Sequence, residues 1–132
     1  MTTLLPKTHI ASKKRILLVD DEIAILKLLE FILKDDYELI TRNNGFDAIS
    51  WLDNGNIPDL IISDMEMPYF DGADFVKSIK VSGYYRNVPL IVLSGSDSLE
   101  NIHNRIPYPI NGLMSKPFNP SILKEKIKTL LN

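Results

Sequence analysis

Short apolar runs alternate with amphipathic segments along this chain. Three runs are continuous, rich in branched side chains and followed by a polar residue; they cover residues 16–19, 60–62 and 90–93. Continuous runs of this length are typical of strands buried on both faces, as in a parallel sheet covered by helices. Two weaker segments, 37–41 and 113–114, predict strands nearer the sheet edges.

Helical periodicity fills the intervals between these runs. In three segments the apolar residues fall on one helical face. These residues are Ile25, Leu29, Ile32 and Leu33, then Leu99, Ile102 and Ile106, and finally Leu123, Ile127, Leu130 and Leu131. Weaker helices are predicted over 46–52 and 74–79. Five β/α units joined by right-handed crossovers predict an α/β fold, a doubly wound five-stranded parallel sheet in the order 2-1-3-4-5.

Length and composition indicate one domain. A chain of 132 residues with 45% hydrophobic content can build one core but not two ordinary ones. Residues 1–14 mix Thr, Pro, Lys and His without periodicity, so we interpret them as a flexible N-terminal leader ahead of a domain over 15–132.

Charge, the length of the apolar runs and cysteine content indicate which partners and which compartment to expect. With 15 basic and 17 acidic side chains the net charge is −2, so we expect no direct DNA binding. No run approaches the roughly 20 apolar residues of a membrane span, and the first residues lack the apolar centre of a signal peptide. The absence of Cys fits a reducing compartment. We therefore expect a soluble cytoplasmic protein with no membrane contact.

Acidic residues stand directly after two of the predicted strands. Asp20, Asp21 and Glu22 follow the first strand, and Asp64 follows the third. In the 2-1-3 order these strands are neighbours, so three aspartates converge at the carboxyl edge, where such sheets bind ligands. Carboxylates about 4 Å apart repel by roughly 4 kcal/mol at an effective dielectric constant near 20. A hard cation offsets this repulsion, and Mg²⁺ leaves coordination positions for phosphate oxygens. The sequence predicts a magnesium site open to a phosphoryl ligand.

Two further polar residues end neighbouring strands. Ser94 closes the fourth predicted strand and Lys116 follows the fifth. Taken singly, Asp21 fits a helix cap, Ser94 a cap or turn former, and Lys116 a solvated surface lysine. Taken together, a hydroxyl and an ammonium beside a metal-bound carboxylate are the partners that an aspartyl phosphate needs. We interpret Asp64 as the nucleophile.

These motifs, in this order, resemble the receiver domains of response regulators. The resemblance rests on segments 19–22 and 64–72, on Ser94 with Gly95, and on Lys116 followed by Pro117 and Phe118. It extends from about residue 15 to the end of the chain and implies a flavodoxin-like fold.

The resemblance also implies roles for individual residues. Asp20 and Asp21 correspond to the Mg²⁺ acids, joined by the Asp64 carboxylate and the backbone carbonyl of Glu66. Asp64 corresponds to the phosphorylated residue. Ser94 corresponds to the switch hydroxyl that moves toward the phosphoryl group. Lys116 corresponds to the phosphoryl group's ion-pair partner, with a cis peptide bond before Pro117.

The function implied is a signalling switch, not an enzyme with a separate substrate. A sensor histidine kinase or histidine phosphotransfer protein would donate the phosphoryl group to Asp64, and the domain would catalyse only this transfer and its own slow dephosphorylation. A conformational change at the face built by the fourth helix, fifth strand and fifth helix would then reach an unknown downstream protein.

Parts of that face depart from the family pattern. Leu113 stands where relatives usually carry an aromatic residue. Pro107 and Pro109 end the fourth helix near Ile106, and Tyr108 is interpreted as an exposed anchor for a partner. The roles of three other residues stay open. In the family, the positions of Glu66 and Ser96 flank the attacking water, and Glu66 could either repel a phosphoryl group or steer water toward it. Trp51 fits either the core or a docking surface.

Three other functions fit parts of this pattern. A degenerate receiver acting as a phosphorylation-independent scaffold is the main alternative, although all five expected polar residues are present. An FMN electron carrier on the same fold is disfavoured because three acids would repel the cofactor's phosphate. An aspartate-dependent hydrolase usually has two acids in one short loop and an added cap domain.

Overall fold

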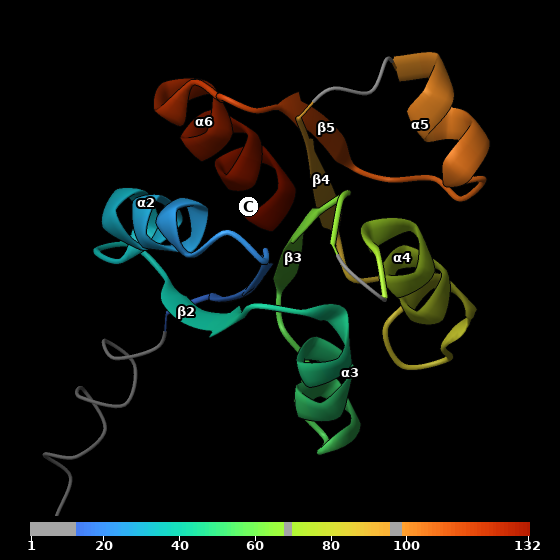
Figure 1. The fold of residues 1–132 in the computed structure, drawn as a ribbon. Helices are drawn as coiled ribbons and strands as arrows, with labels where there is room; N and C mark the ends of the chain where they lie inside the picture. Colours follow the sequence, from blue (N-terminus) through green and yellow to red (C-terminus); the bar gives the residue numbers. More distant parts are fainter. Residues whose placement is uncertain (1–12, 68–69, 96–98) are drawn as a thin grey trace, which may run out of the picture.

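The computed structural model describes residues 13–67, 70–95 and 99–132. Strands and helices alternate along the chain (Figure 1). The strands are β1 (Arg15–Val19), β2 (Glu38–Arg42), β3 (Leu60–Asp64), β4 (Leu90–Ser94) and β5 (Gly112–Ser115). The helices are α2 (Ile23–Leu33), α3 (Gly45–Asp53), α4 (Gly72–Val81), α5 (Leu99–Arg105) and α6 (Pro120–Leu131).

The five strands form one parallel sheet in the order β2-β1-β3-β4-β5, which confirms the predicted doubly wound topology. The register pairs Val19 with Ser63 and Ser94 with Ser115. The carboxyl ends of β1, β3, β4 and β5 therefore lie next to one another. Asp20, Asp21, Asp64, Ser94 and Lys116 follow or occupy these ends.

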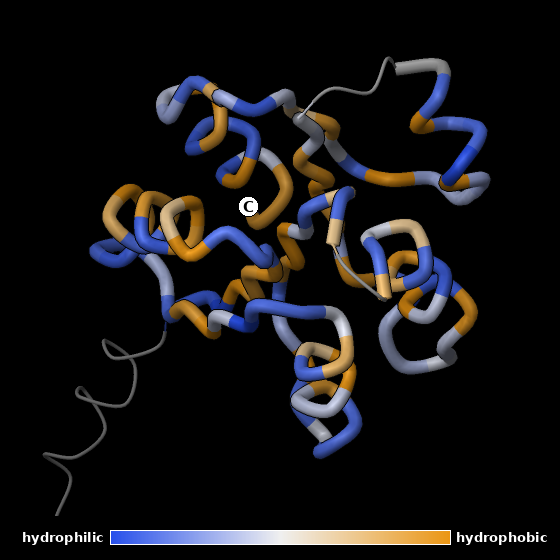
Figure 2. The backbone as a smooth tube through the Cα atoms, in the orientation of Figure 1, coloured by the Kyte–Doolittle hydropathy of each residue, from blue (hydrophilic) through white to orange (hydrophobic). Residues whose placement is uncertain are grey.

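Two hydrophobic clusters show why the strand runs are continuous. Leu17 and Val19 of β1 belong to a cluster that also contains buried side chains of α3, α4 and α5. Ile16 and Leu18 face the opposite way and pack with buried side chains of α2 and α6. Successive strand residues point to opposite faces, so a sheet covered on both sides needs an apolar residue at nearly every position. Figure 2 shows the apolar strands enclosed by helices in which apolar and polar residues alternate.

Local capping explains where three helices begin. Asn44, Asp71 and Asn119 precede α3, α4 and α6, and each side chain accepts a hydrogen bond from an amide of the first turn. At the start of α4, the amide of Asp74 donates to Asp71 Oδ1 over 3.0 Å.

The predicted end of α5 is confirmed, but the prediction for the segment after it is partly wrong. The helix ends at Arg105, two residues before Pro107, as the proline pattern predicts. Tyr108 was expected to be exposed; instead it is half-buried and packs against the α3–α4–α5 cluster, because the chain leaving α5 folds back over the core. Trp51 is also half-buried against this cluster, with the Arg15 guanidinium 6.0 Å from its ring centroid.

Two predictions concern the limits of the described chain. Residues 1–12, which make up most of the predicted leader, lie outside the described residues, so that leader and the domain boundary near residue 15 stay predictions. Ser96 lies outside them as well. Within the described ranges, no helix combines the length and the apolar character that crossing a membrane requires.

Candidate metal and phosphoacceptor site

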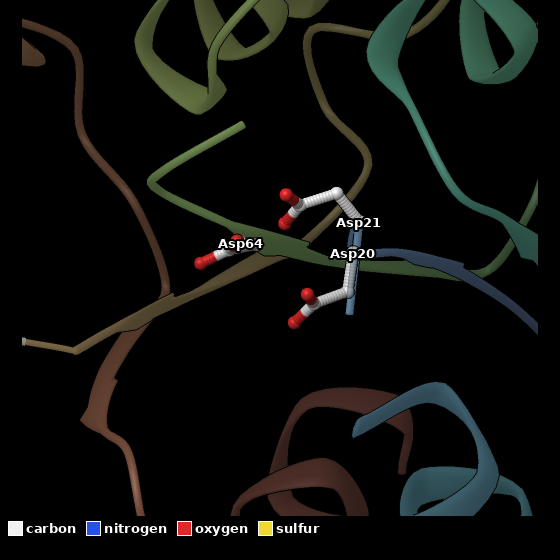
Figure 3. Close-up of side chains that lie close together, drawn as sticks. All are labelled: Asp20, Asp21 and Asp64. Atoms are coloured by element: carbon white, nitrogen blue, oxygen red, sulfur yellow. The ribbon is translucent and has the colours of Figure 1, made fainter. Parts of the chain in front are cut away.

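Three aspartates meet where β1 and β3 end. Asp20 and Asp21 come directly after β1, and Asp64 is the last residue of β3. Carboxylate oxygens from the three residues all lie within 4.8 Å of one another. Figure 3 shows the three carboxylates gathered beyond the strand ends. The expected convergence is therefore confirmed, and the cause is the parallel register of the two strands.

Asp20 and Asp21 sit in different environments. Asp20 is fully buried, and its Oδ1 accepts a hydrogen bond of 2.9 Å from the amide of Glu22. Asp21 is exposed. The residue that caps α2 is Glu22, and its side chain makes no capping hydrogen bond. Asp21 is thus not the cap of this helix, and that simpler interpretation of it is wrong.

Lys116 is the cation of the site. Its Nζ lies 2.9 Å from Asp20 Oδ2, 3.1 Å from Asp64 Oδ1 and 3.1 Å from Glu22 Oε1. Only 12% of its side chain is exposed, so it is not a solvated surface lysine. Its amide donates to the carbonyl of Ser94 over 2.8 Å, and the peptide bond to Pro117 is cis, as the resemblance predicted.

Burial and charge shift the titration of this cluster. Burial raises the pKa of Asp64 to about 6, and the neighbouring charge of Asp20 adds to the increase, while Lys116 opposes it. Burial likewise raises the pKa of Asp20. For Lys116, burial lowers the pKa, but the hydrogen bonds to three carboxylates outweigh it and raise the value above the usual range. The apoprotein therefore holds its acids at an energetic cost that a cation would relieve.

Ser94 presents a buried hydroxyl without a partner. It is the last residue of β4, beside the end of β3, and is 3% exposed. Its Oγ has no hydrogen-bond partner in the described part of the chain. Buried hydroxyl groups are normally hydrogen-bonded. An unpaired hydroxyl beside a carboxylate cluster is therefore available to donate a hydrogen bond to an oxygen of a bound ligand.

A pair of serine variants tests this unpaired hydroxyl. Ser63 is also buried, but its Oγ donates to the carbonyl of Asp64 over 3.1 Å. We expect Ser94→Ala to raise the free energy of unfolding by about 1 kcal/mol and Ser63→Ala to lower it by about 1 kcal/mol, because only the second change removes a hydrogen bond. Urea denaturation in the presence of a chelator measures both. Equal losses in both variants would show that Ser94 has a partner in solution.

The sequence did not reveal an ion-pair network beside the site. Arg105, at the end of α5, places Nη1 2.9 Å from Glu66 Oε1 and Nη2 3.2 Å from Asp71 Oδ2. Glu66 is two residues past Asp64, and its amide donates a hydrogen bond to the Asp64 carboxylate. The partners lie in different β/α units, so no local spacing rule could have predicted the contact.

Gly72 has a positional role that the sequence also missed. It is the first residue of α4, and its amide donates to the carbonyl of Met65 over 3.0 Å. A Cβ at this position would lie 2.2 Å from the carbonyl oxygen of Asp64 and 2.6 Å from the Cα of Met65. Only glycine lets the start of α4 approach the end of β3 this closely.

The sheet order and the acid cluster together define a flavodoxin-like α/β protein with its candidate site at the carboxyl edge of the sheet. A family model described as "Response regulator receiver domain" matches residues 16–128. The chain belongs to this family, and it is a receiver domain of the two-component signalling type.

Relatives and solved structures agree with this assignment. The chain is 35% identical to the transcriptional regulatory protein FlgR of Helicobacter pylori over 86% of its own length, but spans only 28% of that protein. It is 26% identical to the chemotaxis protein CheY1 of Helicobacter pylori, covering 89% of this chain and 96% of that one. The crystallised chemotaxis protein CheY4 of Vibrio cholerae superposes with a TM-score of 0.82 at 30% identity, covering 91% of this chain and all of that one.

Proposed function

We propose that this chain is a phosphoryl-accepting switch whose acceptor is Asp64. The observation that carries the proposal is the position of the Asp64 carboxylate. It lies with Asp20 and Asp21 within 4.8 Å and 3.1 Å from the Lys116 ammonium, at the edge of the sheet. The proposal makes the chain a signalling domain that catalyses only its own phosphorylation and dephosphorylation.

The donor set of the site fits Mg²⁺. Asp20, Asp21 and Asp64 supply hard carboxylate oxygens, and the backbone carbonyl of Glu66 would complete the protein's share, leaving positions for water and phosphate oxygens. When bound, the ion would neutralise negative charge on the acids and on the incoming phosphoryl group.

The phosphoryl transfer follows from the surrounding residues. An Asp64 carboxylate oxygen attacks the phosphorus of a phosphohistidine, an O–P bond forms, the N–P bond breaks, and the imidazole nitrogen leaves with its electron pair. Lys116 orients the carboxylate and pairs with phosphoryl oxygens as their charge approaches the site. The Ser94 hydroxyl, which has no partner in the described chain, donates to one of these oxygens.

The output follows from the same two residues. Ser94 ends β4, Lys116 directly follows β5, and the Lys116 amide donates a hydrogen bond to the carbonyl of Ser94. A phosphoryl group that draws in the Ser94 hydroxyl therefore also shifts the face formed by α5, β5 and α6. Leu113 of β5 and Tyr108 are half-buried against the cluster beneath α5. We infer that repacking of these two side chains replaces the aromatic switch of other receivers.

Partners and location are part of the proposal. A sensor histidine kinase or histidine phosphotransfer protein supplies the phosphoryl group, and a downstream protein, not DNA, reads the altered face. Membership of a two-component family and the net charge of −2 support these partners. A cytoplasmic location is proposed with them.

Intact-mass analysis after incubation with acetyl phosphate tests the function. We expect one phosphoryl adduct on wild type with Mg²⁺, and no adduct with a chelator or in Asp64→Asn, because either change removes part of the acceptor site. Asp35→Asn, an exposed acid in the turn after α2, is the matched control and should be modified like wild type.

The outcomes separate the proposal from its main alternative. An unmodified wild-type protein under all conditions would favour a degenerate receiver that acts as a scaffold. An adduct that persists in Asp64→Asn would place the acceptor elsewhere and contradict the proposal.

A further inference from the structure

A guanidinium group connects α5 to the segment just after Asp64. Arg105 Nη1 contacts Glu66 at 2.9 Å, and Nη2 contacts Asp71 Oδ2 at 3.2 Å. The other oxygen of Asp71 accepts from the amide of Asp74 and caps α4. One side chain therefore joins the end of α5, the acid two residues beyond the phosphoacceptor and the start of α4.

The backbones on both sides of this contact are fixed independently of it. Ile102 and Ile106 are buried around Arg105, and Met65 and Met67 are buried on either side of Glu66. The charged groups themselves lie at the rim, with 34% of the Arg105 side chain and 51% of the Glu66 side chain exposed. Because buried neighbours already anchor the main chain, the ion pair mainly determines where the Glu66 carboxylate points.

The position of that carboxylate matters for Asp64. The Glu66 amide donates to the Asp64 carboxylate, so the two residues are close. A Glu66 carboxylate without its cation would add a negative charge beside the site, and such a charge attracts a divalent cation and repels an anionic phosphodonor.

We propose that Arg105 is a positioning residue: it holds the Glu66 carboxylate against α5 and so keeps the approach to Asp64 open to anionic phosphodonors, at some loss of Mg²⁺ affinity. This inference rests on the proposed function, because it requires Asp64 to be the acceptor. It assigns Arg105 no contact with the phosphoryl group.

Two measurements on Arg105→Ala should move in opposite directions. We expect Mg²⁺, measured by titration calorimetry, to bind about three- to fivefold more tightly, and phosphorylation by acetyl phosphate to be about three- to fivefold slower, with both differences reduced at high salt. A variant with a damaged site would instead lose both metal affinity and rate. Loss of both would overturn the proposal.

Matched variants separate positioning from a general charge effect. Arg86→Ala removes the same charge from an exposed residue ahead of β4, at the opposite edge of the sheet, and should change neither quantity. In a Glu66→Gln background, Arg105→Ala should have little further effect, because the Glu66 carboxylate is no longer there to be held. An equal effect in both backgrounds would show that Arg105 acts through its own charge and would overturn the proposal.

A third substitution and the wild type complete the test. Arg105→Lys keeps the charge but cannot contact two acids with one planar group, so we expect values between those of wild type and Arg105→Ala. If wild type binds Mg²⁺ and is phosphorylated while Arg105→Ala is indistinguishable from it, the positioning role is refuted and the proposed function stands. If wild type does neither, the proposed function fails and this inference fails with it.

Discussion

Replacing Gly72 with alanine is expected to lower the free energy of unfolding by about 3 kcal/mol or more, near the upper end for overpacked sites. The added Cβ would lie 2.2 Å from the carbonyl oxygen of Asp64 and 2.6 Å from the Cα of Met65. Both are backbone atoms of the strand end and cannot move aside as a flexible side chain could. The start of α4 must therefore separate from β3, and the hydrogen bond from the Gly72 amide to Met65 is strained or lost.

Chemical denaturation measures the effect of Gly72→Ala, and Gly83→Ala is its control. A Cβ at Gly83 would meet no atom within 4 Å, so we expect a change within about 0.5 kcal/mol, or a gain of up to about 1 kcal/mol from the stiffer unfolded chain. In Gly72→Ala the displaced strand end should also slow the proposed phosphorylation of Asp64. If both glycine variants kept wild-type stability, the close approach of α4 to β3 would be absent in solution.

Gly72 also illustrates what the sequence could not reveal. The glycine follows Asp71, and such a pair reads locally as a turn. The constraint comes instead from the Asp64–Met65 backbone, which a different element brings to the start of α4. The contact of Arg105 with Glu66 is of the same kind, since it joins residues 39 positions apart. Local patterns describe one element at a time, so contacts between loops of different units lie beyond them.

The fold and the central cluster were predictable for a related reason. A sheet covered on both faces requires continuous apolar strands. Each strand segment, such as 16–19 or 60–62, shows this apolar run in its own sequence, without reference to any other element. Once strand order follows from the crossover rule, the residues after each strand must meet at one edge. Asp20, Asp64 and Lys116 could therefore be placed together without knowledge of any side-chain contact. Tyr108 could not, because its burial depends on how the chain returns after α5.

Replacing Asp64 with asparagine should stabilise the metal-free protein at neutral pH, by about 1 to 3 kcal/mol. Burial raises the pKa of Asp64 from 3.8 to about 6, so the folded state binds a proton more readily than the unfolded state between these values. The free energy of unfolding then falls as pH rises through this window, and the ionised carboxylate costs up to about 3 kcal/mol once pH exceeds the folded-state value. Asparagine has a similar shape and no charge to bury.

The pH dependence of the stability difference between Asp64→Asn and wild type shows whether the buried charge causes it. Below about pH 4 the carboxyl group is protonated in the folded state, so the advantage of Asp64→Asn should shrink toward zero; between pH 4 and 6 it should grow, and above pH 7 it should be constant. Lys116 keeps Asp20 and Glu22 as partners in the variant, which limits the cost of losing one ion pair. Asp35→Asn, an exposed acid, should change stability by less than about 0.5 kcal/mol throughout.

Mg²⁺ should reverse the order of stability, so that wild type becomes more stable than Asp64→Asn. The proposed site exists only in the folded protein, so Mg²⁺ should stabilise wild type by about RT ln(1 + [Mg²⁺]/Kd), while Asp64→Asn, with one carboxylate fewer, should gain less. Urea denaturation of both proteins across pH, with chelator and with saturating Mg²⁺, provides the measurement. If Asp64→Asn were less stable than wild type at pH 8 without metal, or if the difference did not vary with pH, the Asp64 carboxylate would be neither buried nor crowded in the folded protein. The same physical property that destabilises the metal-free protein, an acid kept out of water beside other acids, is what would give the cation its binding energy.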